Sequence, residues 1–226
     1  MKNKKACVAY SFISIPSLSN PILKLKLYLE SAQVAVLNQC LSQSDAFLKA
    51  ALTLIPDIQK QIELSNAAHI SASSLNFDGN TRQLQSTMNS SVVEKFLNEY
   101  LLNMMSTLLI IPDNPDQGVL YLLNGVLNII TKHFNWENLE IKFNLLLNLL
   151  ILLGAYKQEN YLFEIENVEL NDTLYGSDIK YIREINNTIE IVMEEILILF
   201  EKIVSYVYIH IYIYSFIKFF YFVNEK

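Results

Sequence analysis

Histidines and cysteines are the residues with which this chain could bind a metal or attack a substrate, and their spacing favours neither. His69, His133 and His210 stand far apart, without acidic or cysteine ligands at metal-binding spacing. Cys7 and Cys40 belong to no Cys-x-x-Cys pair, which predicts packed free thiols in a reducing compartment. HExxH, GxSxG, GxGxxG and Walker sequences are also absent. The sequence therefore predicts no catalytic, cofactor-binding or metal-binding residues and a protein that is not an enzyme.

The remaining polar and aromatic candidates are better explained by helix structure than by chemistry. Glu194 and Glu195 are typical of a solvated helix face, and His133 near a helix end favours the helix dipole. Trp136, the only tryptophan, is expected to pack at a helix junction, with a surface hot spot as the alternative. The 17 lysines and arginines are scattered and the net charge is −6, so we expect no nucleic-acid partner.

The acidic segment from Glu164 to Asp178 is the one stretch whose composition indicates a binding surface. Aromatic and aliphatic side chains alternate there with carboxylates, a mixture typical of protein-binding edges. A solvated loop is the alternative interpretation. The candidate partner-binding residues are Tyr161, Leu162, Phe163, Asp172, Leu174, Tyr175 and Asp178.

A predicted helix hairpin over residues 25–56 gives the structural unit that would position such a surface. Its apolar residues recur at helical spacing, and small residues of its two halves face one another across a polar turn. Ser42 and Ser44 are expected to cap the second helix, and Pro56 is expected to end it at Ile55. Such a pair cannot bury both apolar faces alone, so another pair must stack against it.

Further helices follow the hairpin along the chain. A polar, Ser/Asn-rich insertion near residues 63–91 is expected to form a surface loop. Ser91 and Glu94 fit a capping box for the next helix, and Asn138 or Glu137 is expected to begin an apolar, buried one. A short helix is expected over residues 156–162, and a long one from Ser177 or Asp178. The fold class predicted is all-α, an antiparallel α-solenoid of helix hairpins over residues 1–203.

The tail, residues 204–226, has a different composition, with Tyr and Ile alternating from Tyr208 to Tyr214. A β-strand is one interpretation. A membrane anchor is another, because Val204 to Val223 has the required length, although His210 and Lys218 interrupt it. The third is translated intron or misassigned reading frame, because an alternating TA repeat with one base changed would encode this pattern. Sequencing the transcript would separate the third from the others.

Four segments resemble a known family in the family's order. They are LYLESAQVAVLNQCLSQSDAFLKAALTLIPDI (27–58), STLLIIPDNPDQGVLYLLN (106–124), FNWENLEIK (134–142) and NDTLYGSDIKYIREINN (171–187). They resemble the carboxy-terminal solenoid of the vacuolar protein sorting 35-like subunit of the retriever complex, a relative of the large retromer subunit. The resemblance covers roughly Ala6 to Glu195.

The resemblance implies a non-enzymatic scaffold in endosome-to-plasma-membrane cargo recycling, located in the cytoplasm and peripherally on the cytosolic face of endosomes. Its solenoid would cradle a small metallophosphoesterase-fold partner, vacuolar protein sorting 29. Coiled-coil-domain proteins and a sorting nexin are further expected partners. The amino-terminal region that would hold the arrestin-like subunit of the retriever is expected to be missing, and this chain is expected to be a fragment.

Two other functions are compatible with the same residues. One is a tail-anchored membrane protein with a cytosolic helical interaction domain. The other is a tetratricopeptide-like adaptor that binds peptides, although the regular period of ~34 residues expected of such repeats is not found.

Overall fold

The computed structural model describes the backbone of residues 2–73, 90–114, 117–176 and 178–224, and the side chains of residues 7–64, 90–114, 117–176 and 178–205. Within these ranges the chain is helical, and the only β-type pairing is an isolated bridge between Ile165 and Val168. The elements are α1 (Lys2–Ser14), η1 (Ile15–Ser17), α2 (Pro21–Leu37), α3 (Leu41–Ser73), α4 (Ser90–Leu108), α5 (Tyr121–Asn128), the π-helical turn η3 (Ile129–His133), α6 (Leu139–Tyr156), α7 (Asn171–Tyr175) and α8 (Ile179–Asn224).

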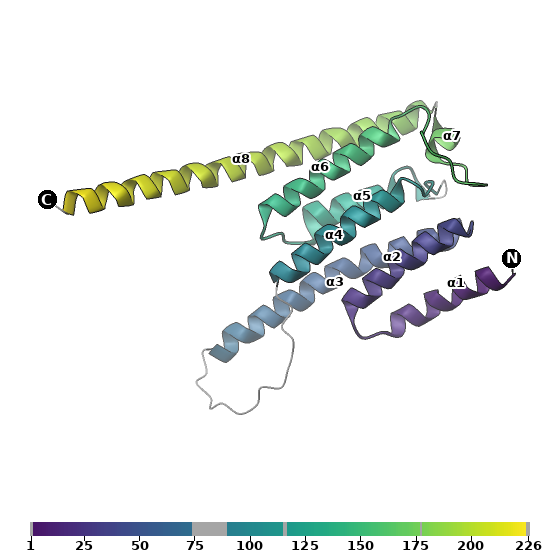
Figure 1. The fold of residues 1–226 in the computed structure, drawn as a ribbon, viewed down its shortest axis with the longest axis horizontal. Helices are drawn as coiled ribbons and strands as arrows, with labels where there is room; N and C mark the ends of the chain where they lie inside the picture. The colour runs from purple at the N-terminus through teal and green to yellow at the C-terminus, as the bar shows by residue number, and fades with distance from the viewer. Residues whose placement is uncertain (1, 74–89, 115–116, 177, 225–226) are drawn as a thin grey trace.

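Antiparallel helix pairs lie side by side in sequence order, as Figure 1 shows. The hairpin of α2 and α3 packs against α4, α5 and η3, and α6 packs between α4 and α8. The connections on one side of this stack gather next to α7, and α8 extends beyond the other helices on the opposite side (Figure 1). The all-α prediction is confirmed, and the stacked hairpins are the arrangement that a solenoid requires.

Small residues let α2 and α3 approach closely, as their composition predicts. Ala32, Ala35 and Ala51 are fully buried in the core. Asn20 caps α2 by accepting a hydrogen bond from the Leu23 amide (3.1 Å), and Pro21 occupies the first helical position, where no amide partner is needed.

The roles predicted for Ser42 and Ser44 were wrong, because both residues lie inside α3 and not before it. The buried Ser44 hydroxyl donates to the Ala32 carbonyl across the hairpin (2.9 Å), so it joins the two helices.

The prediction that Pro56 ends the second helix was also wrong: α3 continues to Ser73. A proline inside a helix removes one hydrogen bond and costs ~3 kcal/mol. Burial of Ile55 and Ile58 on either side offsets this, at about 1.5–3 kcal/mol for each side chain.

A buried carboxylate joins α4 to the start of α6. Glu94 is 2% exposed, and its two oxygens accept hydrogen bonds from the amides of Glu137 and Asn138, the latter at 3.1 Å. Glu94, predicted to act in a capping box at the start of its own helix, thus serves the turn before another helix. Asn138 caps α6 as predicted, through the Glu140 amide (2.9 Å).

Trp136 lies in the same turn and is buried, with its ring centroid 4.7 Å from that of Phe134. This confirms the packed-anchor interpretation, and the surface hot spot was wrong.

The apolar helix α6 lies inside the stack, with one side on α4 and the other on α8. Leu145, Leu146, Leu149 and Leu153 are buried, whereas Ile151 faces outward. Within the part of the chain that the structure describes, α6 is also the one helix with the length and apolar composition to cross a membrane. About a third of this helix is buried in the fold, on the sides that pack against α4 and α8.

Two sequence predictions concern segments that the structure describes only in part. Residues 63–73 continue α3, and residues 74–89 of the predicted insertion lie outside the described residues. The backbone of α8 is helical without interruption to Asn224, so the β-strand interpretation of the tail was wrong. The anchor hypothesis concerns side chains that lie mostly outside the described residues, the mistranslation hypothesis concerns the transcript, and both stay predictions, as does the boundary at residue 203.

Replacing Glu94 with alanine should destabilise the fold, because it leaves the Glu137 and Asn138 amides without their acceptor. We expect a loss of about 1–3 kcal/mol in the free energy of unfolding, measured by urea denaturation. Glu99→Ala, an exposed position on the same helix, is the control and should change stability by less than about 0.5 kcal/mol. Equal effects of the two substitutions would contradict a structural role for the Glu94 carboxylate.

Candidate partner-binding edge

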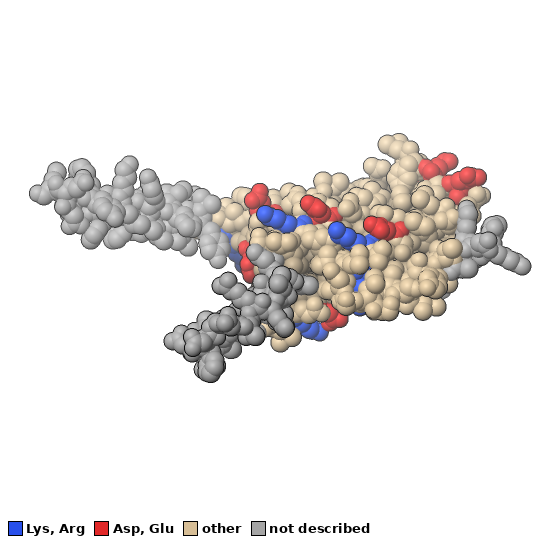
Figure 2. Space-filling model, turned by 60° about the horizontal axis from the view of Figure 1, so that its bottom comes forward, with Lys and Arg blue, Asp and Glu red and all other residues tan. Residues whose placement is uncertain are grey.

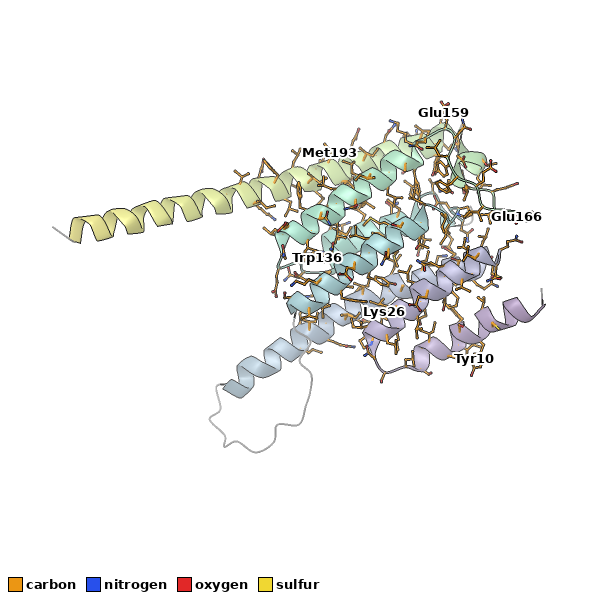
Figure 3. All side chains as sticks on the ribbon, in the orientation of Figure 1. Tyr10, Lys26, Trp136, Glu159, Glu166 and Met193 are labelled. Carbon is orange, nitrogen blue, oxygen red and sulfur yellow. The ribbon has the colours of Figure 1, made fainter. Side chains whose placement is uncertain are left out.

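The segment from Lys157 to Asp178, here called the loop edge, joins α6 to α8 and contains every predicted partner-binding residue. Figure 3 labels Glu159 and Glu166 at this end of the stack and Trp136 toward the other end. Figure 2 shows red acidic side chains at the right end of the molecule and others beside blue Lys and Arg side chains along the same face. The helix predicted over residues 156–162 was wrong: α6 ends at Tyr156, and the chain continues as turns.

The loop edge is held in place by its own short-range hydrogen bonds. Asn167 takes a left-handed conformation (φ 59°), which an asparagine tolerates, and the Val168 amide closes the turn onto the Ile165 carbonyl (3.0 Å). The Asp172 carboxylate accepts from the amides of Tyr161 and Thr173, both at 2.9 Å. The Asp172 charge is therefore used in fixing the loop.

A buried polar cluster ties α7 to the connection between α4 and α5. Asp113 and Asn171 are 7% and 2% exposed. The Asn171 side-chain oxygen accepts from the Asp113 amide (2.8 Å), and one Asp113 carboxylate oxygen accepts from the Leu120 amide (3.1 Å). The Tyr175 hydroxyl donates to the Asp113 carbonyl (3.4 Å). These contacts fix the position of the loop edge relative to the rest of the stack.

Burial changes the acid–base properties of this cluster. Desolvation raises the pKa of Asp113 to about 6; the Leu120 amide lowers it, and the Asp45 charge adds a smaller increase. Burial raises the pKa of Tyr161 to about 12 and that of Tyr156 well above its usual value. The tyrosines are therefore neutral at physiological pH, and the Tyr156 hydroxyl donates to the Leu108 carbonyl (2.8 Å). Asp113, Asn171 and Tyr156 thus act as structure, because the side chain of each hydrogen bonds with a backbone group elsewhere in the chain.

Aromatic stacking completes the support beneath the surface. The rings of Tyr175 and Tyr181 stack with centroids 4.9 Å apart, and those of Tyr161 and Phe163 stack at 5.6 Å. Tyr161 and Tyr175 are half-buried and hold the loop from below, whereas Phe163 remains 38% exposed.

Three apolar side chains of the loop edge remain available to a partner. Leu162 is 97% exposed, and Leu174 and Phe163 are partly exposed. Asp178 is exposed, but its carboxylate accepts from the Lys180 amide and so caps α8 as predicted. The predicted residues thus divide into a supporting set, Tyr161, Asp172 and Tyr175, and an outward-facing set. That partners bind here stays a prediction.

A groove of about 770 Å³ opens beside the loop edge. Its walls come from the start of α3, the α4–α5 connection and the loop edge, and it is lined by Leu41, Asp45, Pro112, Asp113, Val168 and Leu174, among others. The Gln39 side chain also donates to the Glu166 carbonyl (3.4 Å), so the α2–α3 turn contacts the loop edge directly. Sequence inspection missed Asp113 and Asn171, which lie 58 residues apart and share no motif.

Metal chemistry has no support in the part of the chain described. No three His, Cys, Asp or Glu side chains there lie close enough to hold a metal ion. Cys40 is buried and Cys7 is exposed, and both are free. His69 and His210 lie outside the described side chains.

Comparison with known proteins identifies the family to which this chain belongs. The model of the VPS35L C-terminal domain matches residues 3–207. The chain belongs to the VPS35L C-terminal domain family. This confirms the sequence-based identification of a vacuolar protein sorting 35-like, carboxy-terminal portion, and the helix stack and loop edge described above are those of a VPS35L C-terminal domain.

Curated relatives from distant animals match almost the whole domain. The chain is 45% identical over 194 residues to "VPS35 endosomal protein-sorting factor-like" of Homo sapiens and 43% identical to that of Danio rerio, covering 85% of this chain and 18% of each relative. The corresponding Drosophila melanogaster protein is 34% identical over 194 residues, covering 86% of this chain and 18% of the relative. The chain therefore spans less than a fifth of the length of these relatives.

The raised pKa of Asp113 predicts a pH-dependent contribution to stability. Because the folded state holds this carboxyl with a pKa of about 6, above its unfolded value of 3.8, its favourable contribution is complete below pH 3.8 and lost as the pH rises through 6. Asp113→Asn cannot ionise. The free energy of unfolding of the wild type, minus that of Asp113→Asn, should fall by about 2–3 kcal/mol between pH 4 and pH 7.5.

Urea denaturation of both proteins across this pH range measures the difference. Asp57→Asn, at an exposed position on α3, is the matched control. A pH-independent difference for Asp113→Asn would show that the Asp113 carboxyl is not desolvated in the folded protein.

Proposed function

We propose that this chain is a non-enzymatic scaffold segment for endosomal protein sorting, and that it acts by holding a partner subunit on its helical stack. Membership of the VPS35L C-terminal domain family is the observation that carries the proposal. The relatives bear the name of an endosomal protein-sorting factor, which supports an endosome-associated role in the cytoplasm.

The partner we propose is a small metallophosphoesterase-fold subunit, vacuolar protein sorting 29, held in a retriever-type complex that recycles endosomal cargo. Coiled-coil-domain proteins and a sorting nexin would join the same assembly. An arrestin-like subunit would bind through an amino-terminal region and not through this segment. The chain would then associate peripherally with the endosomal membrane, on its cytosolic face.

The loop edge has the physical properties of a contact surface for such a partner. Its backbone is already fixed by the Asp172 carboxylate and the Asp113–Asn171 cluster, so little conformational entropy is lost when a partner binds. Leu162 projects as an isolated apolar side chain that can enter a pocket. The carboxylates beside it favour a partner surface that carries basic residues.

Titration calorimetry of this chain with the purified metallophosphoesterase-fold subunit tests the scaffold proposal. We expect saturable binding with a dissociation constant in the low micromolar range or below, about −8 kcal/mol or better. Absence of binding at micromolar concentrations would contradict the proposed partner.

Leu162→Asp tests whether the loop edge takes part in that binding. It places a charge where an apolar anchor is expected, so the affinity should fall by about tenfold or more. Leu64→Asp is the matched control, because Leu64 is also largely exposed but lies on α3, outside the loop edge. If both variants bind like the wild type, the scaffold proposal stands and the contact surface lies elsewhere on the stack.

A further inference from the structure

A second groove, separate from the loop edge, runs between α3 and the consecutive helices α5 and η3. Its volume is about 510 Å³. Lys49, Leu52 and Pro56 contribute from α3, and Asn124, Asn128 and His133 contribute from the facing helices. Gly125 lets the helices approach at its floor, because a Cβ atom there would lie only 2.7 Å from the Leu52 Cδ1 atom.

Both helices that line this groove depart from α-helical geometry beside it. Pro56 has no amide hydrogen, so the Leu52 carbonyl lacks its usual helical donor. On the opposite wall, η3 is a π-helical turn from Ile129 to His133. Single π-turns are rare, and they occur often at functional sites. The turn also places His133, five residues after Asn128, on the groove wall with Asn124 and Asn128.

Two side-chain amides in the groove have no hydrogen-bond partner among the described residues. Asn124 and Asn128 are half-buried, yet neither side chain hydrogen bonds with any residue that the structure describes. Each amide offers a carbonyl acceptor and an NH₂ donor. Solvent reaches these two amides in the free protein, and a bound backbone can replace that water, because it presents the complementary acceptor and donor at each residue.

The spacing of the two amides matches an extended chain. Residues four apart in a helix are separated by about 6 Å along the axis. Alternate residues of an extended peptide are about 6.6 Å apart. Asn124 and Asn128 can therefore bond to alternate residues of one extended strand. A bound helix would not use them, because its backbone groups already bond to each other.

The lining of this groove can accept an acidic side chain at the end where Lys49 lies. None of the side chains described as lining this groove is a carboxylate, although the chain as a whole carries a net charge of −6. The Lys49 ammonium group lies 5.3 Å from the Tyr121 ring centroid and is also paired with Asp45. An ammonium has three donors, so Lys49 retains the capacity to bind a second carboxylate.

We infer that the groove between α3 and α5 binds an extended peptide segment of a partner protein, with Asn124 and Asn128 bonding to its main chain and Lys49 to an acidic side chain. From Tyr121 to His133 the groove wall extends about 18 Å, long enough for about five extended residues. This binding mode goes beyond the scaffold function proposed above, because it requires no folded partner subunit.

Selection of a phage-displayed library of random 16-residue peptides on the full chain tests the inference. We expect the enriched peptides to share an Asp or Glu at one position of a common motif and to bind at micromolar affinity by fluorescence anisotropy. The double variant Asn124→Leu/Asn128→Leu should bind the selected peptides about tenfold or more weakly. Lys49→Met should reduce the salt dependence of their binding. Proline substitution at alternate peptide positions should be tolerated, because an extended segment, unlike a helix, accommodates proline.

Matched controls separate this result from misfolding and from the scaffold function. Asn103→Leu, at an exposed position on α4, should leave peptide binding unchanged. Thermal unfolding by circular dichroism should show that the double variant is folded. Asn124→Asp is a second variant at the same site, in which the side-chain volume is nearly unchanged. The inference is overturned if no peptide is enriched, if the selected peptides bind the double variant as tightly as the wild type, or if single prolines abolish binding throughout. None of these outcomes depends on calorimetry with the metallophosphoesterase-fold subunit.

Discussion

The mutual burial of apolar faces between neighbouring hairpins is the interaction on which this structure depends. The apolar faces of α2 and α3 are covered by α4, α5 and η3, and α6 is covered by both α4 and α8. Each pair alone would leave one face in water, so the layers stabilise one another. This burial also makes local departures tolerable, since Pro56 and the π-helical turn η3 persist where the surrounding side chains are packed.

The ends of the stack are fixed by buried polar groups. At one end Glu94 accepts the amides that precede α6, and near the other Asp113 and Asn171 join the α4–α5 connection to α7. In each case a side chain from one element satisfies backbone groups of another, as burial of polar groups requires. The turn before α6 and the described residues of the loop edge are therefore held by defined contacts, and a rigid edge is better suited to binding a partner than a loop that must first become ordered.

Two surfaces with different chemistry result from this architecture. The loop edge presents exposed apolar side chains beside carboxylates on a fixed backbone, which suits a folded partner. The groove between α3 and α5 presents unpartnered amides at the spacing of an extended chain. Within the part of the chain described, neither surface gathers three His, Cys, Asp or Glu side chains that could hold a metal ion.

The sequence by itself determined the helical class, the α2–α3 hairpin, the caps at Asn138 and Asp178 and the family, because periodicity, capping and similarity depend on neighbouring residues. It also located the segment that forms the loop edge. Only the tertiary structure decided that α3 passes through Pro56, because burial of Ile55 and Ile58 outweighs a local preference. Likewise, Glu137 lies 43 residues from Glu94 and Asn171 lies 58 residues from Asp113, so only packing could bring each pair together.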